Sequence, residues 1–442
     1  MSRAGFATVL SSLAVLATLA GSPAASAASL SSGSTSLDLG GSLRTIPALV
    51  QAPESDPTLG AFDQTLLRGT AVGRLGEVLR LELHAVESIT ASSGGPASGY
   101  AGSSRSATRY RAFGLRWGQA DQSRFSAGLE VDRASLRVSL PNLDVTVGRQ
   151  PINFSKALFF NPLDAFLPFD PRAFDRDYKP GVDAVRLQVA LGLTTGLEVV
   201  GALGPTLQVD RTVGAVSTQG GFIDATRKGA ALLGRVFTTL GHVDLSLQAG
   251  KVYGGLVAGL GGAGELFGLG WRSELTVFRV DPAEPSTFLP DGRGHFPEVR
   301  LLDDGVSLVV GVERRFESEL FLALEVFHNG LAAQDNLILS GARIALGQTQ
   351  SLSRDLAAVT ASYPLTPLWS VSLAALGSLS DGSLLLTPGI KWSAGRELEV
   401  LAGALVGLGA RPRLDPALGA KVPQTEFGTY PHLLWLEAKL YF

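Results

Sequence analysis

The charged side chains best placed for binding chemistry lie in residues 151–180, which carry both signs of charge. The cations are Lys156, Arg172, Arg176 and Lys179, and the anions are Asp164, Asp170, Asp175 and Asp177. If this segment lined a pore, its mixed charges would create a transverse field with little net preference for either sign of ion. Alternatively, the charges pair with one another or with neighbouring strands, and only hold the segment in place.

Other spacings associated with chemistry are weak. Gly259 to Gly264 matches GxGxxG, but a turn and another alternating strand follow it where a dinucleotide site needs a helix. Small residues that let strands pack closely explain these glycines better. The five histidines are scattered, and the sequence contains neither an HExxH nor a GxSxG motif. A Ser and His pair on a barrel wall is kept as an alternative, but we expect no enzyme, no cofactor and no metal site.

Aromatic residues and prolines set residues 151–180 apart from an ordinary surface loop. Seven aromatic side chains lie there, out of 33 in the whole chain. Five prolines prevent a regular helix or strand. Because the aromatic side chains need burial, and irregular backbone at membrane depth must be covered by protein or line water, we expect this segment to fold into a lumen and narrow it.

The composition indicates which elements hold such a segment. Only 17% of the 442 residues are charged and the mean hydropathy is +0.23, which is too apolar for a surface that faces water throughout. No apolar run after residue 28 reaches the roughly 18 residues that a membrane helix needs. The net charge of -3, without a basic stripe, gives no reason to expect a nucleic-acid partner. Transmembrane strands fit this combination.

Alternation with period two supports these strands. Leucines at 79, 81 and 83 oppose Arg80, Glu82 and His84, and similar patterns recur at 182–191, 243–248 and 306–313. Tight turns alternate with long irregular connections, at about 91–106, 151–180, 205–227, 281–304, 329–353 and 409–430. Membrane barrels have short turns at one end and long loops at the other, whereas nothing in a soluble sandwich favours this difference between its two ends.

The ends of the chain indicate its compartment. Residues 1–27 read as a signal peptide, with Arg3, an apolar stretch and Ala25-Ser26-Ala27 before the cut. The final strand, 432–442, alternates and ends in Phe442, and it resembles the C-terminal strand of Gram-negative outer-membrane proteins. We therefore expect residues 28–442 to form one barrel in the bacterial outer membrane. The chain has no cysteine, so no disulfide contributes.

We count nineteen candidate strands, although bacterial single-chain barrels have even numbers. Residues 124–140 are long and change phase near Asp132, so either a bulge resets the face or a turn splits them. Losing a marginal strand such as 36–46 gives eighteen, and splitting 124–140 gives twenty. We predict an all-β, antiparallel up-and-down transmembrane barrel of about 18 strands, within a range of 16 to 20.

Inward positions of these strands give candidate residues for a lumen wall. They are Arg80, Glu82, Arg133, Arg137, Arg186, Arg235, Arg272 and Glu274. Over all strands, nine basic inward residues balance nine acidic ones. A phosphate or anionic-polymer channel would show a positive ladder instead, so strong anion selectivity is not expected. Trp117, Trp271, Trp369 and Trp392 are expected to form an aromatic girdle near the short turns.

Residues 147–154, 160–166 and 175–186 resemble a segment of porin-like and alginate-export-like outer-membrane barrels. The resemblance implies a diffusion or export channel but transfers no binding residue. We favour passive, weakly selective diffusion of small hydrophilic solutes, with residues 151–180 narrowing the lumen. The alternative is an export or structural barrel for a surface polysaccharide or partner complex, plugged by the same residues. Expected partners are outer-membrane lipid and lipopolysaccharide, the barrel-assembly machinery, and small solutes.

Overall fold

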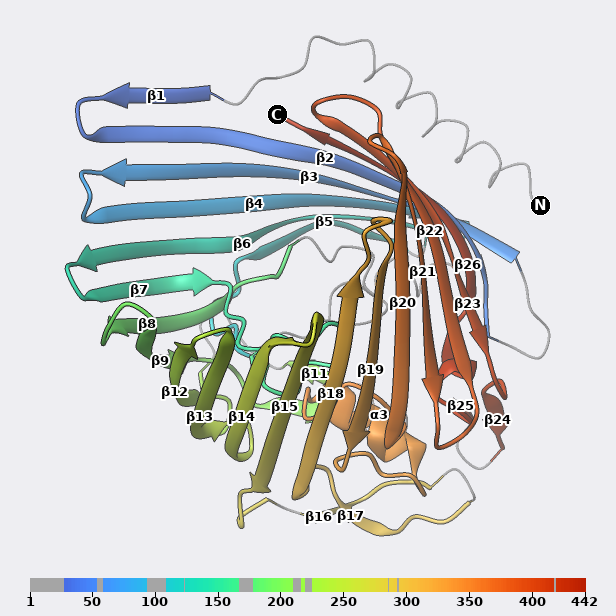
Figure 1. Ribbon diagram of the computed structural model, residues 1–442. Helices are drawn as coiled ribbons and strands as arrows, with labels where there is room; N and C mark the ends of the chain where they lie inside the picture. Colours follow the sequence, from blue (N-terminus) through green and yellow to red (C-terminus); the bar gives the residue numbers. More distant parts are fainter. Residues whose placement is uncertain are drawn as a thin grey trace.

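The computed structural model is a closed antiparallel barrel (Figure 1). It describes residues 28–53, 59–93, 109–122, 124–166, 178–209, 216–218, 225–284, 286–291, 294–416 and 419–442. The predicted signal peptide, residues 1–27, lies outside this part of the chain. The main sheet has 20 strands, but two of them, β1 and β5, pair along one edge only, which leaves 18 strands in the ring.

The strands of the ring follow one another in chain order, and β26 pairs with β2 to close it. Their bounds are β2 Thr35–Gln51, β3 Leu59–Leu75, β4 Leu79–Ser92, β6 Phe125–Leu140, β7 Leu143–Gln150, β8 Val182–Ala190, β9 Thr195–Ala202, β12 Ala231–Leu240, β13 Val243–Val252, β14 Gly255–Leu266, β15 Leu269–Val280, β18 Gly305–Arg315, β19 Phe321–Asn329, β20 Asp355–Thr366, β21 Trp369–Ser378, β22 Leu384–Ser393, β23 Leu398–Leu408 and β26 His432–Tyr441.

The other elements lie outside the ring of strands. Short hairpins lie in three long connections, and one α-helix, α3, follows β19. The bounds are β1 Ala28–Ser32, β5 Arg116–Gln122, β10 Leu207–Val209, β11 Val216–Thr218, β16 Ser286–Phe288, β17 Glu298–Arg300, α3 Leu337–Ala345, β24 Arg413–Asp415, β25 Ala420–Val422 and the 3-10 turn η1 Phe427–Thr429. No helix in the described ranges is long and apolar enough to span a membrane.

The prediction of about 18 strands is confirmed, but for a different reason than expected. The marginal candidate 36–46 is part of β2, one of the longest strands of the ring. The candidate 108–118 is wrong: of its described residues only 116–118 belong to a strand, as the start of β5, and β5 pairs with the first half of β6 alone. Strand β6 stays whole, since the register shifts where His84 pairs with Arg133 and Ala85 with Val131. Asp132 is the extra residue of this bulge, which switches the side chains that follow it to the other face of the strand. This is the first of the two alternatives given for residues 124–140.

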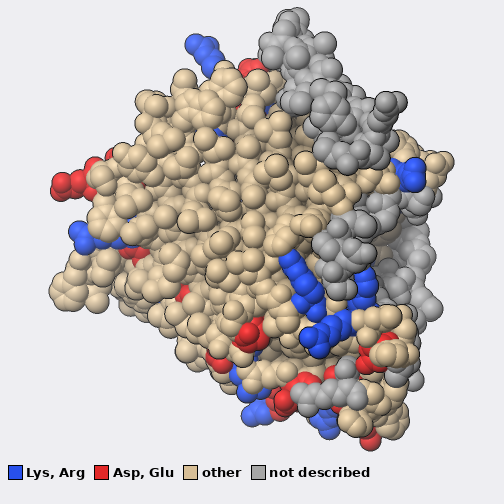
Figure 2. Space-filling model, turned by 90° about the vertical axis from the view of Figure 1, so that its right-hand side faces the viewer, with Lys and Arg blue, Asp and Glu red and all other residues tan. Residues whose placement is uncertain are grey.

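The outer face is apolar and the lumen face polar. On β26, Leu434 is 58% exposed whereas Glu437 is 1% exposed, so leucine points outward and the carboxylate inward. Figure 2 shows a broad uncharged area over one flank of the molecule, with charged side chains gathered toward its margins. Trp271, Trp369 and Trp392 lie at the short-turn ends of their strands, and Trp369 and Trp392 stack at 5.3 Å. Trp117 instead lies in β5, so the expected girdle of four holds for three.

Candidate functional site

A wall carboxylate fixes the beginning of the inward segment. After β7 the chain enters the barrel (Figure 1), and Glu274 of β15 accepts hydrogen bonds from the backbone N–H groups of Lys156 at 2.6 Å and Ala157 at 3.0 Å. The N–H of Leu163 reaches the same carboxylate at 3.3 Å, and the hydroxyl of Ser155 at 2.8 Å. Glu274 is 1% exposed. Hydrogen bonds to a charged acceptor are about twice as strong as neutral ones, so this carboxylate is an anchor.

A second wall carboxylate, Glu325 of β19, binds the segment in the same way, two strands further around the ring than Glu274. It accepts hydrogen bonds from three consecutive backbone N–H groups, those of Leu158 at 2.5 Å, Phe159 at 2.8 Å and Phe160 at 3.3 Å. Residues 155–163 have neither helical nor strand hydrogen bonding, so their N–H groups need other acceptors. The two carboxylates supply them, and they determine the path of the backbone across this wall.

Amide side chains and one ion pair complete the anchoring. Gln350 and Asn161 exchange two hydrogen bonds, from Asn161 N–H at 3.0 Å and to Asn161 C=O at 2.8 Å. Gln248 of β13 donates to the carbonyl of Leu163 at 2.8 Å. Lys156 forms an ion pair with Asp244, and its carbonyl accepts a hydrogen bond from Arg272 at 2.8 Å. These contacts join the segment to β13, β15 and the connection between α3 and β20.

Two glycines of β14 make room for the segment. A Cβ on Gly259 would lie 2.5 Å from Leu163 Cδ2, and a Cβ on Gly261 would lie 2.7 Å from Leu163 Cδ1. Real Cβ atoms do not approach that closely, so Leu163 needs glycine at both places. The first two glycines of the GxGxxG pattern are therefore explained by the close approach of the inward segment to the wall, whereas a Cβ on the third, Gly264, would lie 2.8 Å from the carbonyl of His242 beside β13. The earlier interpretation, close packing of neighbouring strands, accounts for these two glycines only in part.

Aromatic side chains of the segment are buried against the barrel interior, as their number predicted. Phe154 and Phe166 are each 1% exposed and pack edge to face at 5.7 Å. Phe160 stacks on Phe327 of β19 at 4.8 Å, with the rings 10° from parallel. Each buried aromatic ring removes a large apolar area from water. The inward fold predicted for this segment is thus seen in residues 151–166.

The returning arm of the segment is held by different chemistry. The ring of Tyr178 contacts two guanidinium groups, with its centroid 3.5 Å from Cζ of Arg68 and 4.4 Å from Cζ of Arg133. Its hydroxyl lies 2.7 Å from His84 Nδ1, and the carbonyl of Lys179 accepts a hydrogen bond from Arg133 at 3.2 Å. Cation–π contacts of this kind are worth up to about 2 kcal/mol when desolvated. The anchoring residues belong to β3, β4 and β6.

The two anchoring walls lie on opposite sides of the barrel. In the order of the ring, β15 follows β3 by nine places, which is half of the 18 strands. The segment touches β13, β15 and β19 at residues 155–163, and β3, β4 and β6 at residues 178–179. It consequently spans the lumen from one wall to the other, which is the geometry of a constriction.

The predicted site residues fall into four groups. Lys156 pairs with Asp244, and Asp164 pairs with Lys179, so these charges hold the segment as the alternative interpretation required. Five predicted residues lie outside the described ranges: Asp170, Arg172, Asp175, Arg176 and Asp177. The wall residues that touch the inward segment are Arg133, Arg235, Arg272 and Glu274, of which Arg235 lies 5.0 Å from the Phe154 ring.

The remaining predicted wall residues make contacts along the wall. Glu82 pairs with Arg133 at 3.2 Å and with Arg80 at 3.5 Å, Arg137 donates to Thr146 at 3.3 Å, and Arg186 pairs with Glu198. They lie on the polar face as the alternation predicted. Their contact with a solute stays a prediction.

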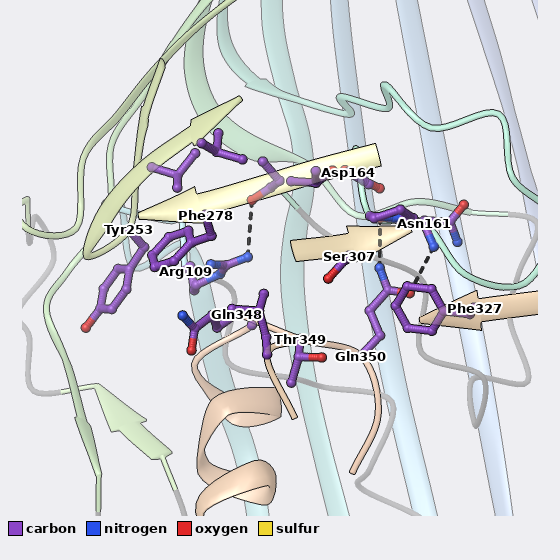
Figure 3. A pocket seen from close by; sticks show the side chains of 17 residues that line it. Arg109, Asn161, Asp164, Tyr253, Phe278, Ser307, Phe327, Gln348, Thr349 and Gln350 are labelled. Carbon is purple, nitrogen blue, oxygen red and sulfur yellow. Dashed lines mark hydrogen bonds between the residues drawn. The ribbon is translucent and has the colours of Figure 1, made fainter. Parts of the chain in front are cut away.

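Several anchoring residues were not singled out from the sequence. Glu325 was counted among the inward charges without a distinct role, and Gln248 and Gln350 carry no charge that would mark them. Arg109, which is buried and donates to the carbonyl of Ala165 at 3.1 Å, comes from an irregular stretch beside β5 (Figure 3). The glycine pair in β14 was the one usable signal, because glycines spaced two apart on a strand mark a close approach to that face.

Solved structures share this architecture. Pseudomonas aeruginosa OccD3 (OpdP) matches with a TM-score of 0.52 and 11% identity, over 95% of this chain and 93% of that one. Pseudomonas aeruginosa OccK11 (OpdR) matches at 0.51 and 10%, over 91% and 96%, and OpdK from the same organism, solved with vanillate, at 0.50 and 10%, over 91% and 98%. No protein-family model and no curated relative matched the chain.

The chain therefore has the fold of an outer-membrane porin, a closed antiparallel barrel of 18 strands with a segment folded into its lumen. The porin part of the resemblance seen in the sequence is confirmed at the level of fold. The alginate-export part stays a prediction.

Proposed function

We propose that this protein is an outer-membrane channel for passive, weakly selective diffusion of small hydrophilic solutes. One observation carries the proposal: a single segment bridges opposite walls and leaves a polar lumen on the faces of the strands beside it. A barrel of this size without a constriction would pass solutes of many sizes, whereas an anchored segment sets an upper limit.

Placement in the outer membrane is part of the same proposal. The uncharged outer face of the barrel requires a hydrocarbon environment, and closed barrels are the one strand architecture that satisfies every backbone group there. The partners we propose are outer-membrane lipid with lipopolysaccharide, the barrel-assembly machinery during insertion, and the solutes themselves. We propose no enzymatic role. Four of the histidines in the described ranges, His84, His295, His328 and His432, contact Tyr178, Asp291, Asp355 and Arg411 respectively.

Planar-bilayer recording tests the function. The purified chain should show discrete conductance steps, and deletion of residues 160–176 should enlarge them, because the bridge across the lumen is then removed. Circular dichroism and heat-modifiable migration would show that the deletion variant still forms a barrel. Silence from both proteins would contradict a channel. A closed wild type with an open deletion variant would instead support the plugged export or structural barrel.

A further inference from the structure

A small cavity lies between the inward segment and the connection that follows α3. Its volume is about 60 Å³, and Figure 3 shows Asp164 and Asn161 on one side of it and Gln348, Thr349 and Gln350 on the other. Strands β13, β14, β15, β18 and β19 close it on the wall side. A water needs about 10 to 15 Å³ by this measure, so the space takes four to six water-sized atoms.

A cation without a carboxylate partner borders this cavity. Arg109 is 7% exposed, its Nη2 donates to the carbonyl of Ala165, and its guanidinium lies flat on Gly347, where a Cβ would be 2.5 Å from Nε. No carboxylate of the described chain forms an ion pair with it. Asp164 borders the same cavity, but Lys179 neutralises it. Buried charges are normally paired, so Arg109 calls for a counter-charge.

The nearby end of α3 only partly meets that need. The backbone carbonyls at the C-terminus of a helix carry roughly half a unit of negative charge, and Gly347 lies two residues beyond Ala345, the last residue of α3. This position explains why a cation is tolerated here. Besides this partial charge, the guanidinium has the ring of Tyr110, whose centroid lies 5.4 Å from its Cζ, but no anion among the described residues, and the single bond to Ala165 leaves its other N–H groups available.

Two hydroxyl groups in the same cavity also lack partners. Thr276 Oγ1 of β15 and Thr349 Oγ1 have no hydrogen-bond partner, although these residues are only 7% and 6% exposed. Gln348 Oε1 is likewise buried and unpartnered, and all three residues line the cavity. Unsatisfied buried polar atoms are rare in folded proteins, and a water or ion held beside them is one reason for several together.

We propose that this cavity binds a small oxyanion of four or five heavy atoms, with dihydrogen phosphate, a monoanion that matches the single cation Arg109, as the best match. Arg109 would neutralise it, the hydroxyls of Thr276 and Thr349 would donate to its oxygens, and its O–H would donate to Gln348 Oε1. Acetate has the right size but lacks that O–H, and an aromatic carboxylate is too large for the cavity.

The site lies behind the inward segment, between that segment and the connection to β20, so its ligand acts as an effector rather than as a permeating solute. A bound anion contacts Arg109, which already holds the carbonyl of Ala165, and Thr349, which belongs to the opposite side of the cavity. It therefore ties the two sides together and stabilises the narrowed state of the lumen.

Equilibrium dialysis of the detergent-solubilised full chain against radiolabelled phosphate tests the site without depending on conductance. We expect saturable binding at one site per chain, displaced by acetate more weakly and not displaced by benzoate. Arg109→Met should lower the affinity by at least roughly tenfold. The matched control, Arg137→Met, removes a lumen-wall arginine outside the cavity and should leave binding unchanged.

Thr276→Val with Thr349→Val keeps the charge of Arg109 and removes both hydroxyls at nearly constant volume. This double variant should weaken phosphate binding by roughly tenfold, and phosphate should raise the melting temperature of the wild type but not of Arg109→Met. Equal phosphate binding by wild type and Arg109→Met would show an adventitious ion only. That result, or no saturable binding by the wild type, would overturn the proposal.

Discussion

Replacement of Glu274 by glutamine should release the inward segment from its wall. The carboxylate accepts hydrogen bonds from three backbone N–H groups, with Lys156 the nearest at 2.6 Å, and from one hydroxyl. A glutamine keeps one acceptor oxygen but places an NH₂ group against N–H donors. Bonds to a charged acceptor are worth about 1.5 to 3 kcal/mol, so the loss of one of them alone costs about 3 kcal/mol at the upper end of that range.

That free energy sets the size of the expected effect. Each 1.4 kcal/mol changes an equilibrium roughly tenfold, so the fraction of molecules with the segment detached should rise about 100-fold. The chain has no cysteine, so a single reporter can be introduced without a background thiol. Leu163 is 1% exposed against β14, and Leu163→Cys should react with a maleimide only while the segment is detached.

The measurement is the labelling rate of Leu163→Cys alone and combined with Glu274→Gln. The reporter loosens the segment by itself, but that cost is common to both proteins and cancels in the ratio. The control is Glu198→Gln on β9, another buried inward carboxylate, which pairs with Arg186 and not with the segment. An equal rate with glutamine at 274 and at 198 would refute the idea that the wall carboxylate anchors the backbone.

Two further perturbations follow from the same contacts. Gly259→Val places a methyl group where Leu163 lies, and the overpacking costs about 1 to 3 kcal/mol. The displaced segment should raise the mean conductance, and adding Leu163→Ala should return the conductance to the wild-type value. A conductance unchanged by the valine would argue against the contact between Leu163 and β14. In the last long connection, burial raises the pKa of Glu426 to about 7, so the folded form holds its proton more tightly than the unfolded one. The stability of this connection should therefore fall by about 3 kcal/mol as the pH rises from about 4.5 to 7. Hydrogen exchange of the peptide 424–432, corrected for intrinsic exchange rates, measures this change. Glu426→Gln should abolish the pH dependence.

The architecture was accessible from the sequence because a barrel repeats one local rule. Alternation over some ten residues is a property of each strand by itself, so eighteen strands give eighteen independent readings of it. The error at residues 108–118 shows the limit. Trp117 alternates with its neighbours as a ring strand would, but β6 meets β7 along its second half, and β5 can pair only with the first half. Pairing between distant segments decides membership of the ring, and alternation does not report it.

The anchors were less accessible, for a different reason. Glu274 and Glu325 occupy the same kind of inward position as Glu82 or Glu198, and nothing in their neighbourhood marks them as acceptors for the backbone of residues 156–163. An inward carboxylate has several uses: it pairs with a cation, it faces water, or it binds amides. Which one it serves depends on a segment more than a hundred residues away in the chain.

This ambiguity changes what the charge balance of the lumen means. Nine inward acids against nine inward bases suggested a neutral field, yet Glu274 and Glu325 are each 1% exposed, and their charges are directed at backbone N–H groups. A solute cannot reach them, and their field is largely met by the amide dipoles that they bind. Arg80, by contrast, keeps a side chain that is 43% exposed. Charges on the strands therefore divide into those that hold the inward segment and those that face the open lumen, and in the proposed channel the second group alone would set the selectivity.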